Sequence, residues 1–334
     1  MVSGYDRGQA EVTTVTSKVR VLRYLVRRLA FAFALVFVVS SGAIVLARLS
    51  PGDFASASLG LDTRPDTVAA ARARAGLDRP FLEQYTAWLG GAVRLDFGRS
   101  LAYDRPVGEL VPERAANTAV LAVTSLALAF AIGIPLGVVT GTRGGRWVAP
   151  LVRLVSLLLL SMPPLLTSLF LVFLAARTGW LPTGGMRSAV EGGGVVDVLR
   201  HLVVPVLALA LPLGAMLERL QSQAMSEVAQ QPYLLSALAR GVPRSRVVWR
   251  HALTVAIGPL LSTFGLVAGS VLSGSFAVEI VTSWPGLGRL TFEALRARDI
   301  YLVAACAAAG ATFLAVSTLL ADVALAWADP RATD

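Results

Sequence analysis

Long apolar runs alternate with charged, glycine-rich or proline-rich segments along this chain. Six of the runs are close to the ~20 residues that a helix needs to cross the hydrocarbon core of a bilayer, and they carry almost no charged side chains. They cover residues 29–47, 117–140, 152–176, 201–217, 252–278 and 302–327. The pattern predicts an all-α polytopic membrane protein with six transmembrane helices.

The segment 226–251, between the fourth and fifth predicted spans, differs from the other connections because it is basic and amphipathic. Pro232 suits the first turn of a helix, whereas Gly241 and Pro243 suit its end, so a short helix is expected over residues 232–240. Its leucines and alanines form more apolar surface than one short helix can bury by itself. An exposed apolar helix of this kind is typical of one that lies in a groove of a partner protein.

Arginines indicate the orientation of the spans. They are concentrated before the first span and in the loops after the second and fourth spans, as at Arg143 and Arg250. Because basic residues mark cytoplasmic loops, both termini and the segment 226–251 are predicted to be cytoplasmic. The expected division is a cytoplasmic tail at 1–28, a transmembrane domain at 29–334, and within it an extracytoplasmic loop at 48–116.

Composition narrows the functional classes. The chain has 334 residues, 55% of them hydrophobic, and a net charge of +9. Arginines at the inner boundaries of the spans account for this charge through attraction to anionic lipid, so a nucleic-acid partner is not expected. Cys306 is the only cysteine, and His201 and His251 are the only histidines. A metal site and a disulfide within the chain are therefore not expected.

A membrane enzyme is the alternative from a different class. The sequence has no HExxH helix and no GxxxxGK[ST] phosphate loop, and neither histidine lies at the depth of the serines in the fifth span. An ion-coupled secondary transporter would need ionisable groups inside the spans, and Asp322 is the one candidate recognised from the pattern. We therefore expect no catalytic activity and no cofactor in this chain.

The long loop at 48–116 places apolar residues at helical spacing. Phe81, Tyr85 and Trp88 lie on one face of a predicted helix that is expected to break at Gly90. This surface suits either a cap on the membrane domain or a docking site for a soluble partner. Burial of apolar side chains favours the cap.

Small residues recur at intervals of four in two of the spans. They place small side chains on one helix face, which lets two helix backbones approach closely. Packing within the subunit and packing between subunits both fit this pattern. The predicted helix-packing residues are Gly133, Gly137, Gly141, Gly265, Gly269 and Ser273.

Several short segments, in a fixed order, resemble one family. They include YLVRRLA, ARLSPGDFA, RLDFGRSL, GWLP, YLLSALARGVPRSRVVWRHAL, SWPGLGRL and ADVALAWADPR. The chain resembles the DppB/OppB-type permease subunits of binding-protein-dependent ABC importers, the peptide and nickel group. The resemblance runs from about residue 24 to residue 331.

The resemblance implies partners and a mechanism. The partners are a homologous second permease (DppC/OppC-type), two cytoplasmic ATPases that bind ATP and Mg, and an extracytoplasmic substrate-binding protein, in a bacterial or archaeal plasma membrane. In the family a short helix of this segment enters the ATPase, and the residues expected to couple to it here are Tyr233, Leu234, Ala237, Leu238, Ala239, Arg240, Gly241 and Pro243. Motion of this helix would drive alternating access in a type I importer architecture.

A second family segment lies between the fifth and sixth spans. It is expected on the outer side, as part of a gate or as a contact for the binding protein, and it matches Glu279, Trp284, Pro285, Gly286 and Gly288. The family transports di- and oligopeptides, nickel chelates and other small solutes. Because the spans lack a cluster of soft metal ligands, peptides are the expected substrate and nickel the alternative.

Overall fold

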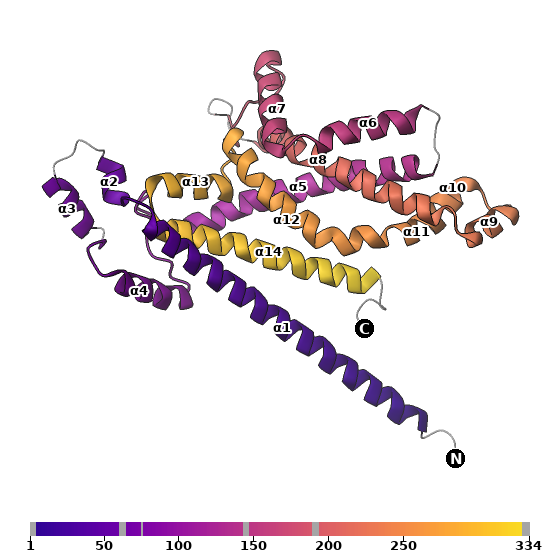
Figure 1. Cartoon of the computed structure of the whole chain (residues 1–334), viewed down its shortest axis with the longest axis horizontal. Coiled ribbons are helices and arrows are strands. Elements are labelled where there is room, and N and C mark those ends of the chain that lie inside the picture. Colours follow the sequence, from indigo (N-terminus) through magenta and orange to yellow (C-terminus); the bar gives the residue numbers. More distant parts are fainter. Residues whose placement is uncertain (1–4, 60–64, 75, 143–146, 189–193, 329–334) are drawn as a thin grey trace.

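The computed structural model describes residues 5–59, 65–74, 76–142, 147–188 and 194–328. Within these ranges the chain is helical and has no strand, apart from one isolated bridge between Arg99 and Pro106. Long helices lie side by side along most of the molecule, and shorter helices gather at the two ends (Figure 1). The all-α prediction is confirmed.

Five helices among the described residues are long and apolar enough to cross a membrane. They are α1 (Tyr5–Leu49), α5 (Val107–Gly141), α8 (Val195–Val228), α12 (Gly258–Val281) and α14 (Ile300–Ala328). The shorter helices are α2 (Phe54–Leu59), α3 (Pro65–Arg74), α4 (Phe81–Val93), α9 (Pro232–Ala239), α10 (Arg244–Arg246), α11 (Leu253–Ala256) and α13 (Leu287–Ala297). A π-helix, Val247–Ala252, joins α10 to α11.

The third predicted span is not one straight helix. It is a pair, α6 (Val148–Leu160) and α7 (Pro164–Thr178), bent by 102° at the intervening break. Pro163 and Pro164 explain the bend, because neither can donate a backbone N–H and Pro163 has the extended angles φ −58° and ψ 148°. Counted as one broken span, the pair makes the sixth membrane segment.

Helix ends also differ from the sequence pattern. α1 runs without a break from Tyr5 to Leu49, so the predicted tail continues the helix of the first span. α5 begins ten residues before the predicted span and passes through Pro112, and α4 continues through Gly90 to Val93. Hydropathy marks the apolar part of a helix and not its polar extension beyond the membrane.

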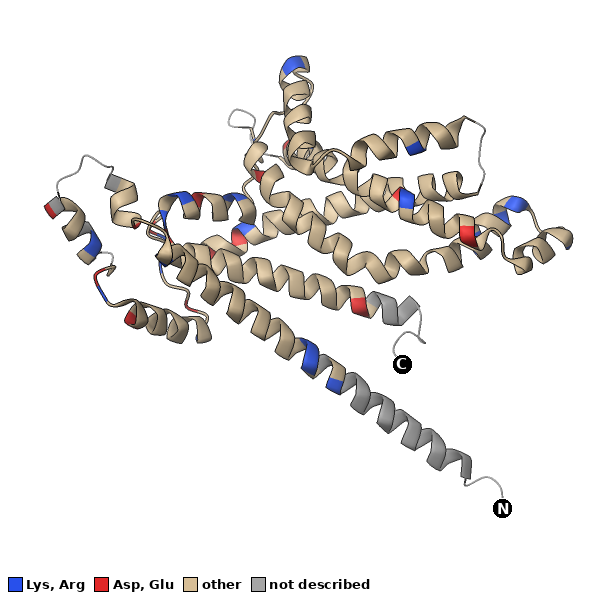
Figure 2. Cartoon of the chain, in the orientation of Figure 1, with Lys and Arg blue, Asp and Glu red and all other residues tan. Residues whose placement is uncertain are grey.

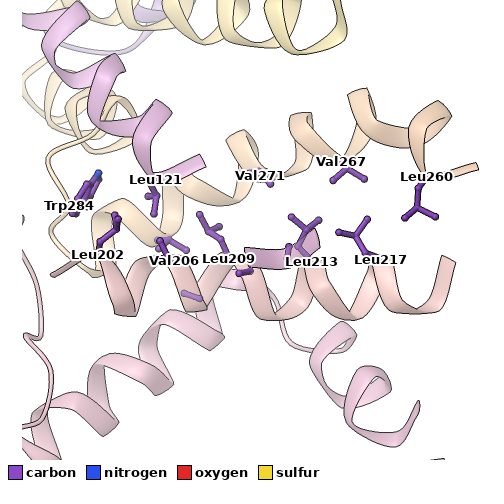
Figure 3. Packing of buried hydrophobic residues seen from close by; sticks show 14 residues of the cluster. Leu121, Leu202, Val206, Leu209, Leu213, Leu217, Leu260, Val267, Val271 and Trp284 are labelled. Atoms are coloured by element: carbon purple, nitrogen blue, oxygen red, sulfur yellow. The ribbon is translucent and has the colours of Figure 1, made fainter. Parts of the chain in front are cut away.

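The core lies around α8. α5, α6, α7 and α12 all pack against this helix. Figure 3 shows leucines and valines of α8, including Leu209 and Leu213, facing Leu121 of α5 and Val267 of α12. Trp284, which follows α12, closes one end of this cluster and is fully buried. A helix with apolar residues on several of its sides is typical of the centre of a bundle.

The two ends of the bundle carry different elements (Figure 1). We call them the α9 end, which contains α9 to α11, and the α13 end, which contains α2 to α4 and α13. The amino end of α1 and the carboxyl end of α14 point toward the side of the α9 end. Charged residues are concentrated at the two ends and are rare between them (Figure 2), as expected for a bundle that crosses a bilayer. Arg143 lies outside the described residues.

Candidate coupling and gate sites

Helix α9 has the boundaries that its sequence predicts. Pro232 occupies the first turn, and Gly241 follows the carboxyl end with φ +81°. The N–H of Gly241 donates to the carbonyl of Leu238 (2.9 Å), and the N–H of Val242 donates to that of Ala237 (3.2 Å). These two bonds form a Schellman cap, whose left-handed position suits glycine. Arg240, Gly241 and Pro243 thus set where α9 stops.

One face of α9 packs on the bundle. Leu234 and Ala237 are buried and belong to an apolar cluster with Val138 of α5, Met225 of α8 and Ala256 of α11. The family resemblance grouped these two residues with the partner-facing ones, but the structure places them on the opposite, inward face. The reason is their spacing of three, which puts both side chains on one side of a short helix.

The other face of α9 is exposed and apolar. Tyr233, Leu235 and Leu238 are 44%, 61% and 40% exposed, and Ala239 and Arg240 are also exposed. Leu235 is absent from the residues expected from the resemblance, because which side of this short helix faces outward is decided by the side that packs on the bundle. The α9 end therefore presents a mainly apolar surface with one arginine. We call it the α9 surface, and its residues are Tyr233, Leu235, Leu238, Ala239 and Arg240.

Glu279 is the centre of the candidate gate at the α13 end. Its carboxylate is fully buried and accepts hydrogen bonds from the hydroxyl of Thr118 (2.7 Å) and the N–H of Gly288 (2.7 Å). It also accepts the N–H of Arg289 (3.2 Å). The last two donors lie in the first turn of α13, where unpaired N–H groups favour an anion. Glu279 thereby joins α12, α5 and α13.

The turn between α12 and α13 is tied to α5 by further bonds. The Trp284 indole N–H donates to the carbonyl of Asn117 (3.1 Å), and the Asn117 amide donates to the carbonyl of Pro285 (2.8 Å). Thr118 also accepts the N–H of Leu287 (2.7 Å). Asn117 and Thr118 were not recognised from the sequence, because nothing in α5 signals which polar residues of an apolar helix meet a distant turn.

Two glycines allow this close arrangement. A Cβ added at Gly286 would overlap the Glu279 carboxylate, and one at Gly288 would lie 2.7 Å from Cα of Phe276. Any larger residue would move α13 away from α12, since Cβ atoms do not approach backbone atoms so closely. The five residues expected in this segment therefore lie in one connected cluster.

Tyr103 and Glu293 add a second connection at the α13 end. The Tyr103 hydroxyl donates to the Glu293 carboxylate, which also accepts the Arg289 Nε–H (2.8 Å). Burial and this bond raise the pKa of Tyr103 to about 12. Burial alone would raise the pKa of Glu293, but the bonds from Tyr103 and Arg289 outweigh it and lower that pKa.

A buried aspartate, Asp299, fastens the loop before α5 to the start of α14. It accepts the hydroxyl of Ser100 (2.6 Å), the N–H of Ala102 (3.0 Å) and the N–H of Leu302 (3.1 Å). The last bond caps α14, so an acidic side chain stabilises that helix start. The sequence pattern missed Asp299, although an Asp immediately before a long apolar run is an N-cap signal.

The glycines at intervals of four line two helix contacts inside the chain. A Cβ added at Gly133, Gly137 or Gly141 would lie 2.7, 2.7 or 2.5 Å from a backbone oxygen of α8. Gly265 and Gly269 face α14 more loosely, at 3.2 and 3.3 Å from its side chains.

Ser273 differs from the glycines with which its spacing groups it, because it is exposed. The residue next to it, Gly274, faces Leu209 of α8 (3.2 Å) and Pro164 of α7 instead. Four-residue spacing drifts around a helix of 3.6 residues per turn, and this moves the third member away from the contact.

The loop helix α4 covers part of the α13 end. Trp88 is buried with Ile44 of α1 and Ala304 of α14, and Phe81 and Tyr85 pack beside it. The Tyr85 hydroxyl donates to Ser41 of α1 (2.9 Å). This geometry is that of a cap on the bundle.

An ion-coupled transporter would need ionisable side chains inside its membrane spans. Asp322 pairs with Arg28 of α1 (2.5 Å), and both side chains are about 30% exposed. Glu218 of α8 is 2% exposed and was missed, because the predicted span ended one residue before it. Among the described residues, no group of three or more His, Cys, Asp or Glu side chains could hold a metal ion.

Comparison with known proteins identifies the family. Residues 133–334 match the family described as binding-protein-dependent transport system inner membrane component, and residues 21–121 match the N-terminal family of the same membrane components. The chain belongs to this family. It is a multi-pass, non-catalytic permease subunit of an ABC importer, which works with ATPase and substrate-binding partners.

Curated relatives are similar over nearly the whole chain. A putative peptide permease protein of Brucella suis is 32% identical over 314 residues, covering 93% of this chain and 98% of the relative. The oligopeptide transport system permease AppB of Bacillus subtilis is 32% identical over 314 residues, covering 92% and 98%. The glutathione transport system permease GsiC of Escherichia coli K12 is 30% identical over 285 residues, covering 85% and 90%.

Proposed function

We propose that this chain imports di- and oligopeptides as one of two transmembrane permeases in a complex with two ATPases and an extracytoplasmic binding protein. The names of its relatives, which refer to peptides, oligopeptides and glutathione, support this substrate class. Nickel or another small solute is the alternative within the family. The second permease is a homologue of this chain, and the ATPases hold ATP and Mg.

The α9 surface is the coupling site in this proposal. The apolar side chains of Tyr233, Leu235 and Leu238 are exposed at one end of the bundle. Exposed apolar surface of this kind is typical of a site that binds a groove in a partner protein. The opposite face of α9 is anchored to α5, α8 and α11 through Leu234 and Ala237. A partner that moves the α9 surface therefore moves these spans with it, because close-packed apolar contacts transmit displacement.

The connected cluster at the α13 end is the outer gate or the contact for the binding protein. Glu279, Trp284, Gly286 and Gly288 link α12, α13 and α5 there. In this orientation both termini and α9 are cytoplasmic, and α2 to α4 lie outside the cell in a bacterial or archaeal plasma membrane. ATPase closure at α9 would then shift α8 relative to this cluster, which gives alternating access.

Co-purification tests the coupling site. The tagged chain is isolated from its native membrane as wild type and as Leu235→Glu and Leu238→Glu variants, and associated proteins are identified by mass spectrometry. We expect the ATPases to be lost from both variants while the second permease remains, because a carboxylate in an apolar groove is costly.

Leu82→Glu is the matched control, because Leu82 is 70% exposed on α4, at the α13 end of the bundle. It is expected to leave all partners in place. Retention of the ATPases with both α9 variants, together with normal peptide uptake, would exclude the α9 surface as the coupling site. Uptake of nickel without peptide uptake would favour the alternative substrate.

A further inference from the structure

A cleft of about 460 Å³ lies between α6 and the carboxyl-terminal half of α8, on the part of α8 that leads to the α9 end. It is open to one side, and its volume is within the range of small-ligand sites. Its lining is mixed, with two arginines, one glutamate and several hydroxyl or amide side chains next to leucine. The lining residues are Arg153, Ser156, Leu157, Glu218, Arg219, Ser222, Gln223 and Ser226.

Glu218 is the buried acid of this cleft. It is 2% exposed, and its Oε1 accepts the hydroxyl of Thr140 of α5 (2.6 Å). Within the ranges that the structure describes, no arginine, lysine or histidine comes within ion-pair distance of it. A buried carboxylate with one neutral partner is costly, and acids at such positions in membrane proteins commonly serve transport.

Among the residues that the structure describes, no acid pairs with either arginine of the cleft. Arg153 donates one side-chain hydrogen bond, to the carbonyl of Thr140 (3.1 Å). The side chain of Arg219 is exposed and makes no hydrogen bond or ion pair with any described residue. The cleft thus holds charges of both signs that do not satisfy each other, which leaves both available to a ligand.

Glu218 places a negative charge inside the bundle, beside the two exposed arginines. It is ten residues before the end of α8 at Val228, and that distance is about 15 Å along a helix. Its partner Thr140 is in the last turn of α5. A solute whose path follows α8 from the α13 end toward the α9 end would meet the cleft in the last part of that path.

We propose that this cleft is a subsite for the charged ends of the transported peptide. The Glu218 carboxylate receives the peptide ammonium group, and Arg219, with Arg153, receives a peptide carboxylate. A zwitterion fits because a simple anion would face Glu218 and a simple cation would face two arginines. This inference rests on the peptide importer function proposed above and adds the residues that contact the substrate.

Uptake by the full complex, reconstituted in vesicles of phosphatidylcholine and phosphatidylglycerol, tests the subsite. The probe is radiolabelled trialanine, supplied with its binding protein and ATP. Loss of one charge-assisted bond predicts that Glu218→Gln and Arg219→Gln each lower the uptake rate about tenfold. Glu113→Gln, at an exposed residue of α5, is the control and is expected to keep the wild-type rate.

Thiol labelling gives a second measurement that does not depend on transport rate. Ser222→Cys places a thiol in the cleft, whereas the native Cys306 is buried. We expect trialanine, under turnover conditions, to slow the reaction of this thiol with a charged methanethiosulfonate reagent. Ser58→Cys places a thiol at an exposed position of α2, and the peptide is expected to leave the reaction rate of that thiol unchanged.

The outcomes separate the two proposals. If the wild-type complex transports trialanine but both charge variants match Glu113→Gln, or if trialanine does not protect Ser222→Cys, the subsite is refuted and the importer function stands. If the wild-type complex takes up no peptide at all, the proposed function itself fails. The uptake assay is repeated in vesicles to which phosphatidylethanolamine has been added. If Glu218→Gln and Arg219→Gln lower the uptake rate only in those vesicles, the cleft holds a lipid headgroup and not the substrate.

Discussion

The candidate sites at the two ends of the bundle are held in place by different contacts. At the α13 end, side-chain hydrogen bonds join residues more than 160 positions apart, as from Thr118 to Glu279 and from Ser100 to Asp299. At the α9 end, helix α9 is anchored by apolar contacts of Leu234 and Ala237. Hydrogen bonds require fixed directions, whereas apolar contacts are non-directional and depend on close packing.

This difference fits the two proposed roles. A gate must return to the same closed geometry in each cycle, and directional bonds to a buried carboxylate specify that geometry. A coupling helix must carry the spans with it as its partner opens and closes, and close-packed apolar contacts transmit that displacement.

The largest effect is expected from Glu279→Ala. This change leaves the hydroxyl of Thr118 and two N–H groups of α13 without their acceptor and opens a cavity, which costs about 3–5 kcal/mol. The measurement is thermal unfolding of the purified permease in detergent. Glu113→Gln, on the exposed surface of the same end, serves as the control, and equal melting temperatures for the two variants would contradict the role of the buried carboxylate.

Neighbouring leucines of α9 separate packing from coupling. Leu234→Ala removes a buried side chain and is expected to lower the free energy of unfolding by about 2–3 kcal/mol. Leu235→Ala, at a residue that is 61% exposed, is expected to leave stability within about 0.5 kcal/mol and to weaken ATPase association instead. Unfolding and co-purification, measured on both variants, check the pair. A stability loss with Leu235→Ala as large as with Leu234→Ala would show that α9 is oriented differently.

Gly137→Ala tests the tight contact between α5 and α8. The added Cβ would lie 2.7 Å from the carbonyl oxygen of Glu218, so overpacking is expected to cost about 1–3 kcal/mol. Gly265→Ala places its Cβ 3.2 Å from that of Ala321, and the cost there is expected to be below about 1 kcal/mol. Thermal unfolding of the two variants gives the comparison, and the reverse order would contradict it.

The smallest effect is the alkaline titration of Tyr103. Because its pKa is raised from 10.0 to about 12, the stability that it contributes is complete below pH 10 and is lost as the pH rises toward 12. The difference in tyrosinate absorbance between the wild type and Tyr103→Phe is expected to have its midpoint near 12. A midpoint near 10 would mean that the Tyr103 hydroxyl is neither buried nor bonded to Glu293.

The sequence alone was enough to predict that the chain is a polytopic membrane protein, to which family it belongs, and where helix α9 begins and ends. These features depend on local composition: run length sets the spans, and Pro232 and Gly241 restrict backbone angles within their own neighbourhood. The bend at Pro163 and Pro164 was readable in principle, because two adjacent prolines disfavour a continuous helix.

Only the tertiary structure decided which residues meet. Whether Gly137 faces α8 or another subunit, and whether Leu234 or Leu235 points outward, depends on the side from which a neighbouring helix approaches. Periodicity defines faces of a helix but not their neighbours. Glu218, Thr118 and Asp299 carry little signal in the sequence for the same reason, since a polar residue in or beside an apolar run acquires its role from groups that are 78 to 199 positions away.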